Sequence, residues 1–315
     1  YEYFLWEQGA TLEGIKFYRF KLKELNGNEW AMKSEFPTTP EEAFQSTGQK
    51  VFSPAYIQPL YKDCMEPEFK GDVFADARRG PDALKNIRFD KTKDGDLWIW
   101  TMPDFSEPIE NRYCAFADIG GRTKKADYSV IKVFDRYWMM DGGSPEVVAI
   151  WKGHLDQDLF AWKCAQICTM YGNALLAVEV NSLAREKADS EGDHFLTVLD
   201  EIADYYKNLY TRNDIEKVGE DWIPKYGFHT NAKTKPMIIN ALNAAARERY
   251  LKDKDEDEGF HYIERDSRTV DEMSSYEVKP DGTLGAVEGA HDDLVIVTAG
   301  GAWLSVFSFR LLRSI

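Results

Sequence analysis

Four acidic residues at three places in the chain stand out because the sequence around them is apolar or turn-forming. Asp292 and Asp293 lie side by side behind His291, directly before the apolar run LVIVTAGGAWL. Asp118 ends the apolar run YCAFA and precedes Ile-Gly-Gly, and Glu179 lies between two valines in LLAVEVN. Acidic side chains are almost never fully buried without a partner. Carboxylates placed in this way indicate either capping and ion pairing or a site for cations.

Each acidic position also has an ordinary structural explanation. An aspartate before two glycines suits a turn, a glutamate inside a strand can form an ion pair, and aspartates before a helix can cap its N terminus. These three explanations are independent of one another, whereas one metal site accounts for all three positions. Oxygen ligands favour hard cations such as Mg²⁺ or Mn²⁺ over zinc.

We therefore predict a site for two divalent cations, Mg²⁺ or Mn²⁺, held by Asp118, Glu179 and Asp293, with Asp292 as a further metal ligand. Two such ions close together hydrolyse phosphodiesters, because one activates the attacking water and the other stabilises the leaving oxygen. The helical period turns one of the two adjacent aspartates toward the sheet and the other about 100° away. Asp293 is favoured as the main ligand, and the choice between it and Asp292 stays open.

The elements that position these residues follow from hydrophobic periodicity and turn residues. A strand at 113–120 is followed by strands within 129–140 and 146–155, joined by the turn DGGSP, which predicts antiparallel hairpins. Strands followed by alternating helices and strands predict an α/β fold with a mixed sheet flanked by helices. The remaining elements predicted here are a helix at 156–171, a strand at 174–180, a helix at 193–209, a strand at 225–230, a helix at 234–252, a hairpin at 276–288 and a last helix at 291–309.

The last helix is apolar almost all round, so we expect it to pack flat against the sheet. Gly300 and Gly301 within it cost about 1 kcal/mol each relative to alanine. They indicate that this helix approaches a strand closely. We expect the ends of the first and fourth core strands to be neighbours, with the start of the last helix beside them.

The first 50 residues are expected to form an irregular extension. The stretch FYRFKLKEL (17–25) is strand-like, and Thr39 and Pro40 suit the start of a short helix. The chain starts without a methionine or a signal-like segment, so we expect it to be a piece of a longer protein. The elements predicted between this extension and the core are a short helix at 54–63 and strands at 69–75 and 96–102.

The protein has 315 residues and a formal net charge of −15, from 39 basic and 54 acidic residues. This charge argues against a protein that coats nucleic acid by bulk electrostatics, but bound cations can supply positive charge locally to a nucleic-acid enzyme. A hydrophobic content of 43% indicates a folded globular protein. No apolar run approaches the roughly 18–20 residues that span a bilayer, so we expect a soluble protein without a membrane segment.

Five segments resemble the nuclease domain of the viral terminase large subunit, the DNA-packaging motor of tailed phages. They are FPTTPEEAFQSTGQKVF (36–52), ADIGGRTKKADYSV (117–130), LLAVEVNS (175–182), YGFHTNAKTKPMII (226–239) and EGAHDDLVIVTAGGA (288–302). The resemblance implies an RNase H-like α/β fold over residues 51–315, with residues 1–50 as the tail of the ATPase domain or a linker. No P-loop of the form G-x-x-x-x-G-K-[ST] occurs, so we expect the ATPase domain of the motor to be absent from this chain.

The same resemblance implies roles for individual residues. The metal-binding acidic residues of the family fall on Asp118, which would bridge both ions, and on Glu179 and Asp293. His291 and Asp127 occupy auxiliary positions near the metals. The hairpin predicted before the last helix resembles an element beside the DNA groove. Candidates for contact with phosphates are the basic residues Arg122, Lys124, Lys125, Lys233 and Lys235.

The function that the resemblance implies is a metal-dependent endonuclease. It would cleave double-stranded, concatemeric DNA during phage genome packaging by two-metal-ion hydrolysis. Its partners in the full motor would be double-stranded DNA, the portal protein and the terminase small subunit. The location would be the cytoplasm of the host cell, as expected for a phage or prophage protein.

Three alternatives remain. Another RNase H-like nuclease, such as a resolvase or an integrase, would share the metals but not the segment 36–52. The stretch DIGGRTKKADYS also resembles the first phosphate loop of the actin–hexokinase kinases, but the second Asp-Gly phosphate loop of a sugar kinase is missing. A non-enzymatic docking module with a degenerate site is disfavoured because the acidic set is intact.

Overall fold

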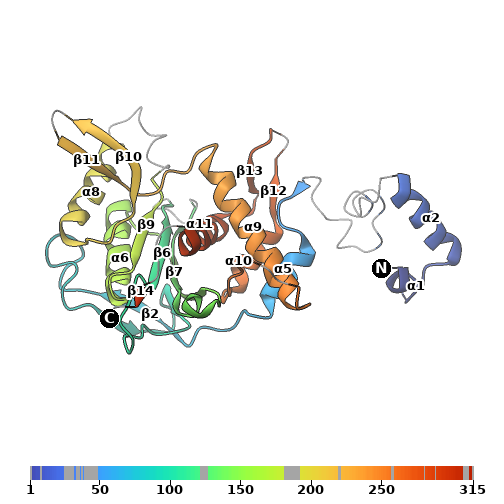
Figure 1. The fold of residues 1–315 in the computed structure, drawn as a ribbon, viewed down its shortest axis with the longest axis horizontal. Coiled ribbons are helices and arrows are strands. Elements are labelled where there is room, and N and C mark those ends of the chain that lie inside the picture. Colours follow the sequence, from blue (N-terminus) through green and yellow to red (C-terminus); the bar gives the residue numbers. More distant parts are fainter. Residues whose placement is uncertain are drawn as a thin grey trace. The chain divides into compact units, whose positions relative to one another are not determined.

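The chain divides into two compact units (Figure 1). One consists of Tyr1–Gln49 and Glu277–Thr283, and the other of Lys50–Tyr276 and Leu284–Ile315. All the acidic positions singled out in the sequence belong to the second unit. The structure is a computed structural model that describes residues 2–7, 9–24, 32, 36, 38, 49–120, 127–180, 192–218, 221–256, 259–279, 281–287, 289–307 and 312–313.

The described residues of the first unit form two helices where the sequence predicted an irregular, partly strand-like extension. The prediction of a strand at 17–25 is wrong, because a helix covers nearly all of this stretch. Apolar residues alternate there, but Ile15, Tyr18 and Leu22 also repeat at helical spacing and share one small core. The short helix predicted near residue 40 lies outside the described residues. The two helices are α1 (Glu2–Glu7) and α2 (Leu12–Glu24).

A mixed sheet of seven strands forms the centre of the second unit, in the order β3-β2-β4-β8-β7-β6-β9. Figure 1 labels β2, β6, β7 and β9 of this sheet. Every strand of the sheet except β3 was predicted from the sequence. The strands are β2 (Phe69–Phe74), β3 (Arg88–Lys91), β4 (Leu97–Ile99), β6 (Tyr113–Asp118), β7 (Ser129–Asp135), β8 (Glu146–Gly153) and β9 (Leu175–Val178).

Strand direction in the core of this sheet follows the predicted pattern. β6, β7 and β8 form an antiparallel meander, and β9 then pairs with β6 in parallel. The predicted α/β fold, a mixed sheet flanked by helices, is therefore confirmed. Ala117 lies opposite Val178 in the β6–β9 register. The C-terminal ends of the first and fourth core strands are thus neighbours, as expected.

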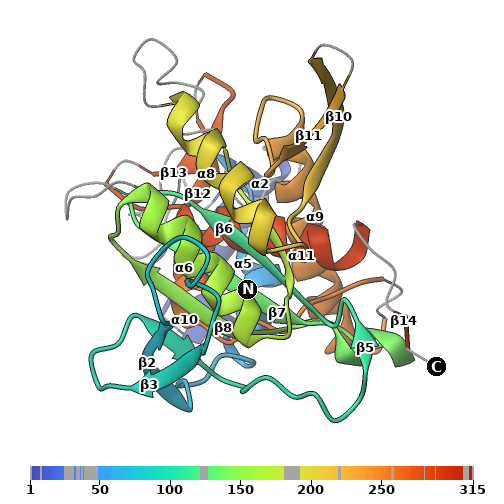
Figure 2. The ribbon, with the colours of Figure 1, turned by 90° about the vertical axis from the view of Figure 1, so that its left-hand side faces the viewer.

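Helices cover both faces of the sheet (Figures 1 and 2). Helices α6 and α8 share one hydrophobic core with the sheet and lie in front of it in Figure 2. Helices α5, α9, α10 and α11 share a second core on the opposite face. The helices around the sheet are α5 (Pro54–Tyr61), α6 (Gln157–Met170), α8 (Gly192–Tyr205), α9 (Thr234–Lys252), α10 (Ser267–Ser274) and α11 (Asp293–Phe307), and all of them except α10 were predicted.

Among the residues that the structure describes, no helix combines the length and the apolar character needed to span a membrane.

The last helix, α11, lies directly on strands β6 and β7. A Cβ atom on Gly300 would lie 2.4 Å from Cδ2 of Phe116, and one on Gly301 would lie 2.0 Å from Cε2 of Phe134. Both distances are far shorter than van der Waals contact, so glycine is required for this approach. The close approach predicted from the two glycines is confirmed, and it keeps the start of α11 beside the sheet.

Short strands complete the fold. The prediction of a strand at 225–230 is wrong beyond Tyr226, where the observed strand ends. That strand belongs to a hairpin that the sequence did not predict. The predicted hairpin at 276–288 is confirmed as β12 and β13, in a three-stranded sheet with β1. The short elements are β1 (Gln49–Lys50), β5 (Ile109–Glu110), the 3₁₀ helix η1 (Tyr137–Asp141), β10 (Thr211–Val218), β11 (Asp221–Tyr226), β12 (Tyr276–Val278), β13 (Leu284–Ala286) and β14 (Leu312–Arg313).

Candidate metal centre

The parallel pairing of β6 with β9 brings two of the predicted acidic residues together. Asp118 is the last residue of β6, and Glu179 directly follows β9. The backbone N–H of Glu179 donates a hydrogen bond of 2.8 Å to the carbonyl oxygen of Ala117. Besides burial, the Glu179 carboxylate also raises the pKa of Asp118. One end of the sheet therefore carries two neighbouring acidic residues.

The start of α11 contributes the other two acidic residues, which point in different directions. The backbone carbonyl of Asp292 accepts the N–H of Ile296 at 3.0 Å, so Asp292 has the position of a helix cap. The Asp293 side chain is buried, and its Oδ2 accepts the backbone N–H of Tyr128 at 3.2 Å. The Asp292 side chain is half-buried, with Oδ2 3.8 Å from Nζ of Lys235. We call Asp118, Glu179, Asp292 and Asp293 the acidic cluster.

Burial and repulsion from nearby carboxylates raise the pKa values of two members of the acidic cluster. Burial raises the pKa of Asp118 well above its ordinary value, and the Glu179 carboxylate and the charges of Asp293 and Asp292 add to this effect. Burial and the charge of Glu272 raise the pKa of Asp293 to about 7, against the hydrogen bond from Tyr128. A protein without a compensating positive charge therefore resists full ionisation of this cluster.

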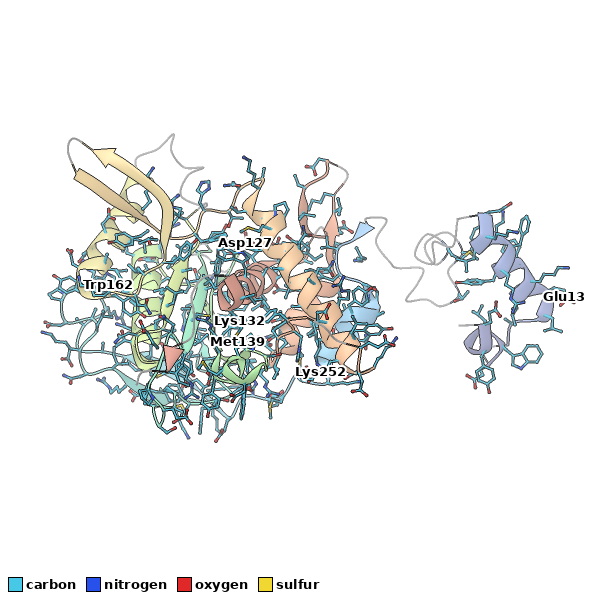
Figure 3. The ribbon with its side chains drawn as sticks, viewed as in Figure 1. Glu13, Asp127, Lys132, Met139, Trp162 and Lys252 are labelled. Carbon is cyan, nitrogen blue, oxygen red and sulfur yellow. The ribbon has the colours of Figure 1, made fainter. Side chains whose placement is uncertain are left out.

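Asp293 also belongs to a second group of possible metal ligands. One ligand atom each from Asp127, His291 and Asp293 lies within 4.8 Å of the other two. Nδ1 of His291 is 3.8 Å from Oδ1 of Asp127 and 3.9 Å from Oδ2 of Asp293. Asp127 and His291 are exposed, so this side of Asp293 is open to solvent. Figure 3 shows Asp127 next to α11.

The donor set fits hard divalent cations. Its ligand atoms are carboxylate oxygens with one imidazole, and such oxygen-rich sets suit Mg²⁺ or Mn²⁺. A bound cation would offset the repulsion that raises the pKa values of Asp118 and Asp293. The two groups share Asp293, so a cation could lie on either side of its carboxylate.

Two half-buried charged residues that the sequence analysis did not select hold the start of α11. Glu272 of α10 accepts the backbone N–H of Leu294 at 2.8 Å with Oε2, and Nζ of Lys152 lies 3.1 Å from its Oε1. Lys152 of β8 also lies 4.7 Å from the ring centre of Tyr128. This pair connects α10 and β8 to the ring of Tyr128, whose backbone N–H binds Asp293. Lys152 could have been selected from the sequence, because it is a lone charge in the apolar stretch VVAIWKG.

The basic residues predicted to contact phosphates are placed only in part. Lys235, in the first turn of α9, lies beside Asp292. Lys233 lies directly before α9 and is exposed. Its backbone N–H donates a hydrogen bond of 2.8 Å to Oδ1 of Asn231. The three others, Arg122, Lys124 and Lys125, lie outside the described residues.

A second buried charged group lies deeper between the sheet and the helices. Lys132 of β7 is fully buried, as is Glu264, whose carboxylate oxygens are 2.9 and 3.1 Å from the lysine Nζ. The same Nζ donates to Oγ1 of Thr269 at 2.6 Å and of Thr298 at 2.8 Å. Figure 3 shows Lys132 apart from Asp127. These partners satisfy the ammonium group, so this network joins β7 to α10 and α11 and leaves no donor for a ligand.

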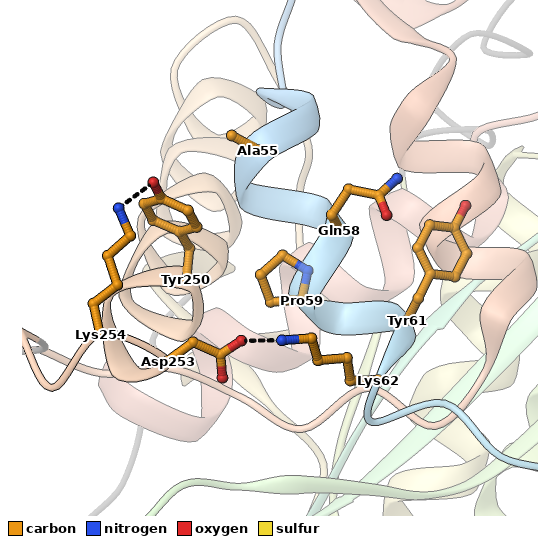
Figure 4. A pocket seen from close by; sticks show the side chains of 8 residues that line it. All are labelled: Ala55, Gln58, Pro59, Tyr61, Lys62, Tyr250, Asp253 and Lys254. Carbon is orange, nitrogen blue, oxygen red and sulfur yellow. Dashed lines mark hydrogen bonds and ion pairs between the residues drawn. The ribbon is translucent and has the colours of Figure 1, made fainter. Parts of the chain in front are cut away.

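A surface hollow of about 480 Å³ lies elsewhere, between α5 and the C-terminal end of α9 (Figure 4). Nζ of Lys62 is 2.6 Å from Oδ2 of Asp253 on one side of it. Lys254 bonds to the hydroxyl of Tyr250 on the other side. Both lysines are used within the protein, and no cluster of acidic groups faces the hollow. It does not resemble the acidic cluster chemically.

Comparisons with known proteins add structural neighbours. No protein-family model matches this sequence, and no curated protein matches it. The chain is similar to the large terminase nuclease from thermophilic phage G20c with bound magnesium, at 14% identity and a TM-score of 0.48, over 82% of this chain and 97% of that chain. The same nuclease with bound cobalt has a TM-score of 0.47, and a further structure of it has 0.46, both at 14% identity. All three of these structures are large terminase nucleases of that phage.

Proposed function

We propose that this chain is a metal-dependent endonuclease that cleaves double-stranded DNA by two-metal-ion hydrolysis of phosphodiesters. The observation that carries the proposal is the neighbouring position of Asp118 and Glu179 at the ends of β6 and β9, with the charge of Asp293 acting on Asp118. Burial and mutual repulsion disfavour this arrangement unless cations are bound. An RNase H-like fold that collects carboxylates from two strands and a helix is suited to such a reaction.

The proposed roles follow from where each carboxylate lies. Besides burial, the charges of Glu179 and Asp293 both raise the pKa of Asp118, so Asp118 would bridge two cations. Glu179 and Asp293 would each hold one, with Asp127 and His291 on the open side of Asp293. Divalent cations in such a site activate a water molecule and stabilise charge on the leaving oxygen. Tyr128 and Glu272 keep Asp293 and its helix in place.

The proposed substrate is the DNA that a phage packages. Lys233 and Lys235 lie at the start of α9, where Lys235 is already close to Asp292, so both are candidates to contact phosphates beside the acidic cluster. We propose the same role for Arg122, Lys124 and Lys125. In a complete packaging motor the partners would be the ATPase domain, the portal protein and the small subunit, in the host cytoplasm.

Plasmid cleavage tests this proposal directly. Supercoiled plasmid is incubated with the wild-type chain in Mn²⁺, in Mg²⁺ and in EDTA, beside Asp118→Ala and the control Asp94→Ala, which changes an exposed aspartate. We expect nicking and linearisation with metal, none in EDTA, and loss of cleavage in Asp118→Ala only. A plasmid left intact by the wild type with both metals would contradict the proposal, and binding of ATP would then favour the sugar-kinase alternative.

A further inference from the structure

The side chain of Tyr276, the first residue of β12, is fully buried, with an exposed fraction of 0%. Its hydroxyl has no hydrogen-bond partner among the residues that the structure describes. Buried polar groups are almost always hydrogen-bonded, because losing water without gaining a partner is unfavourable. An isolated buried hydroxyl therefore needs an explanation, such as a partner that forms only in another state of the protein.

The surroundings of Tyr276 identify that state. After burial, the charges of Asp292 and Glu179 have the largest effects on its phenol, and both raise its pKa. The hydroxyl therefore stays a protonated donor at neutral pH, close to two members of the acidic cluster. Nζ of Lys235 lies 6.0 Å from the centre of the Tyr276 ring and 3.8 Å from Oδ2 of Asp292. The tyrosine, the lysine and the aspartate thus occupy one small region beside the proposed metal centre.

The position of Tyr276 is held by its own strand and by the segment before α5. Its backbone carbonyl accepts the N–H of Val51 at 3.1 Å, and its ring centre lies 5.8 Å from that of Phe52. The preceding carbonyl, of Ser275, accepts the N–H of Val287 at 3.0 Å. The ring is therefore fixed by its own strand and by the segment before α5. A fixed, buried donor beside carboxylates is arranged to receive a partner that moves toward it.

We propose that Tyr276 is a positioning residue of the acidic cluster, whose hydroxyl donates a hydrogen bond to the Asp292 carboxylate when the cluster is ionised and holds divalent cations. A carboxylate has more acceptor sites than one cation uses, and the remaining sites are normally hydrogen-bonded in metal sites. Lys235 and Tyr276 would orient Asp292 from different directions. This inference rests on the proposed function, because it assigns Tyr276 to the metal-loaded state.

The test compares Mn²⁺ binding of the whole chain, measured by electron paramagnetic resonance, with its melting temperature in EDTA. The variants are Tyr276→Phe, Asp292→Asn and the double variant. Tyr262→Phe is the matched control, because Tyr262 is equally buried and its hydroxyl contacts Sδ of Met273 at 3.8 Å. Removal of a hydrogen bond to a metal ligand typically weakens metal affinity or activity by about 10- to 100-fold.

We expect Tyr276→Phe to lose about 10- to 100-fold in Mn²⁺ affinity, and Tyr262→Phe to lose none. In EDTA, Tyr276→Phe should melt no lower than wild type, because it removes a hydroxyl that has no partner there. The double variant should bind Mn²⁺ no more weakly than Asp292→Asn alone, because the hydroxyl acts through that carboxylate.

Each other outcome overturns the inference. If wild type binds Mn²⁺ and cleaves DNA while Tyr276→Phe keeps full affinity, or if the two losses add in the double variant, the positioning role is wrong and the nuclease proposal stands. A Tyr276→Phe variant that melts well below wild type in EDTA would show that the hydroxyl supports the fold instead. If wild type neither binds Mn²⁺ nor cleaves DNA, the proposed function fails and the inference fails with it.

Discussion

Asp292 and Asp293 are adjacent in the chain, yet their carboxylates lie in different surroundings. Asp293 is buried and accepts a hydrogen bond from the backbone of Tyr128, whereas Asp292 is half-buried and lies beside Lys235. Neighbours on a helix point about 100° apart, which allows one carboxylate to face the strands and the other to face α9. The two adjacent aspartates therefore serve different parts of the site, Asp293 toward the strands and Asp292 toward α9.

The raised pKa of Asp293 predicts a pH-dependent stability in the metal-free protein. The folded state keeps the proton of this carboxyl up to a pKa of about 7, whereas the unfolded chain releases it near the ordinary value of 3.8. The folded state thus binds more protons between these values, so the free energy of unfolding falls as pH rises through this window. Replacing Asp293 by asparagine removes the effect. The difference between Asp293→Asn and wild type should grow by at most about 4 kcal/mol between pH 4 and 8.

Urea unfolding in EDTA at pH 4, 6 and 8 measures this difference. Asp293→Asn should gain stability relative to wild type as pH rises. Addition of Mn²⁺ at pH 8 should stabilise wild type and leave Asp293→Asn nearly unchanged, because ligands that bind only the folded state stabilise it. A difference between the two proteins that does not change with pH would contradict the buried, repelled state of this carboxyl.

At the residue scale, the sequence could point to carboxylates but not to the groups around them. Asp118 and Glu179 could be selected because each interrupts or ends an apolar run. Glu272 and Tyr276 have no such signal, because a glutamate in a polar helix and a tyrosine in a strand are ordinary. Glu272 was selected in the structure because it accepts a hydrogen bond from the start of α11. Tyr276 was selected because its buried hydroxyl has no partner among the described residues. Both features appear only in the three-dimensional structure.

At the element scale, prediction succeeded where periodicity and turn residues agreed. The meander of β6, β7 and β8 has apolar runs separated by glycine-rich turns, so its strands could be predicted. The stretch 17–25 satisfied both the strand and the helix periods, and packing within the first unit selects the helix. The β10–β11 hairpin has a polar first strand, TRNDIEKV, and gives no apolar alternation to recognise.

The contact of α11 with the sheet predicts a strong effect of one methyl group. In Gly301→Ala the new Cβ would lie 2.0 Å from the Phe134 ring, so the helix or the ring must move. Overpacking of this kind costs about 1–3 kcal/mol. We expect a lower free energy of unfolding and also weaker Mn²⁺ binding, because Asp293 is carried by the displaced helix.

Urea unfolding and Mn²⁺ titration of Gly301→Ala check both effects. Gly14→Ala in α2 is the control, because its Cβ would meet only Oγ1 of Thr11, at 3.7 Å. This control should leave the unfolding of the second unit and its Mn²⁺ affinity unchanged. If Gly301→Ala kept both the stability and the metal affinity of wild type, the close packing of α11 would not be what positions Asp293.

At the scale of the whole molecule, the formal charge of −15 opposes the approach of DNA. Binding must then depend on a few basic residues and on the cations in the acidic cluster. Each phosphate contact made by a lysine releases condensed counterions, so the affinity falls with salt in proportion to the number of contacts. A protein with this charge and few such contacts should bind duplex DNA weakly, with a modest salt dependence.

Replacement of Lys233 and Lys235 by alanine should therefore reduce the salt dependence of DNA binding. Each lost phosphate contact lowers the slope of log affinity against log salt by about 1, so the double variant should lose about 2. Fluorescence anisotropy of a labelled duplex between about 50 and 200 mM NaCl measures the slope. The control is Lys62→Ala with Lys254→Ala, which removes two lysines at the remote hollow of Figure 4 and should leave the slope unchanged. Equal slopes for wild type and the Lys233–Lys235 variant would exclude the start of α9 from the DNA interface, and tight binding at physiological salt that persists in Asp118→Asn would place the DNA away from the acidic cluster.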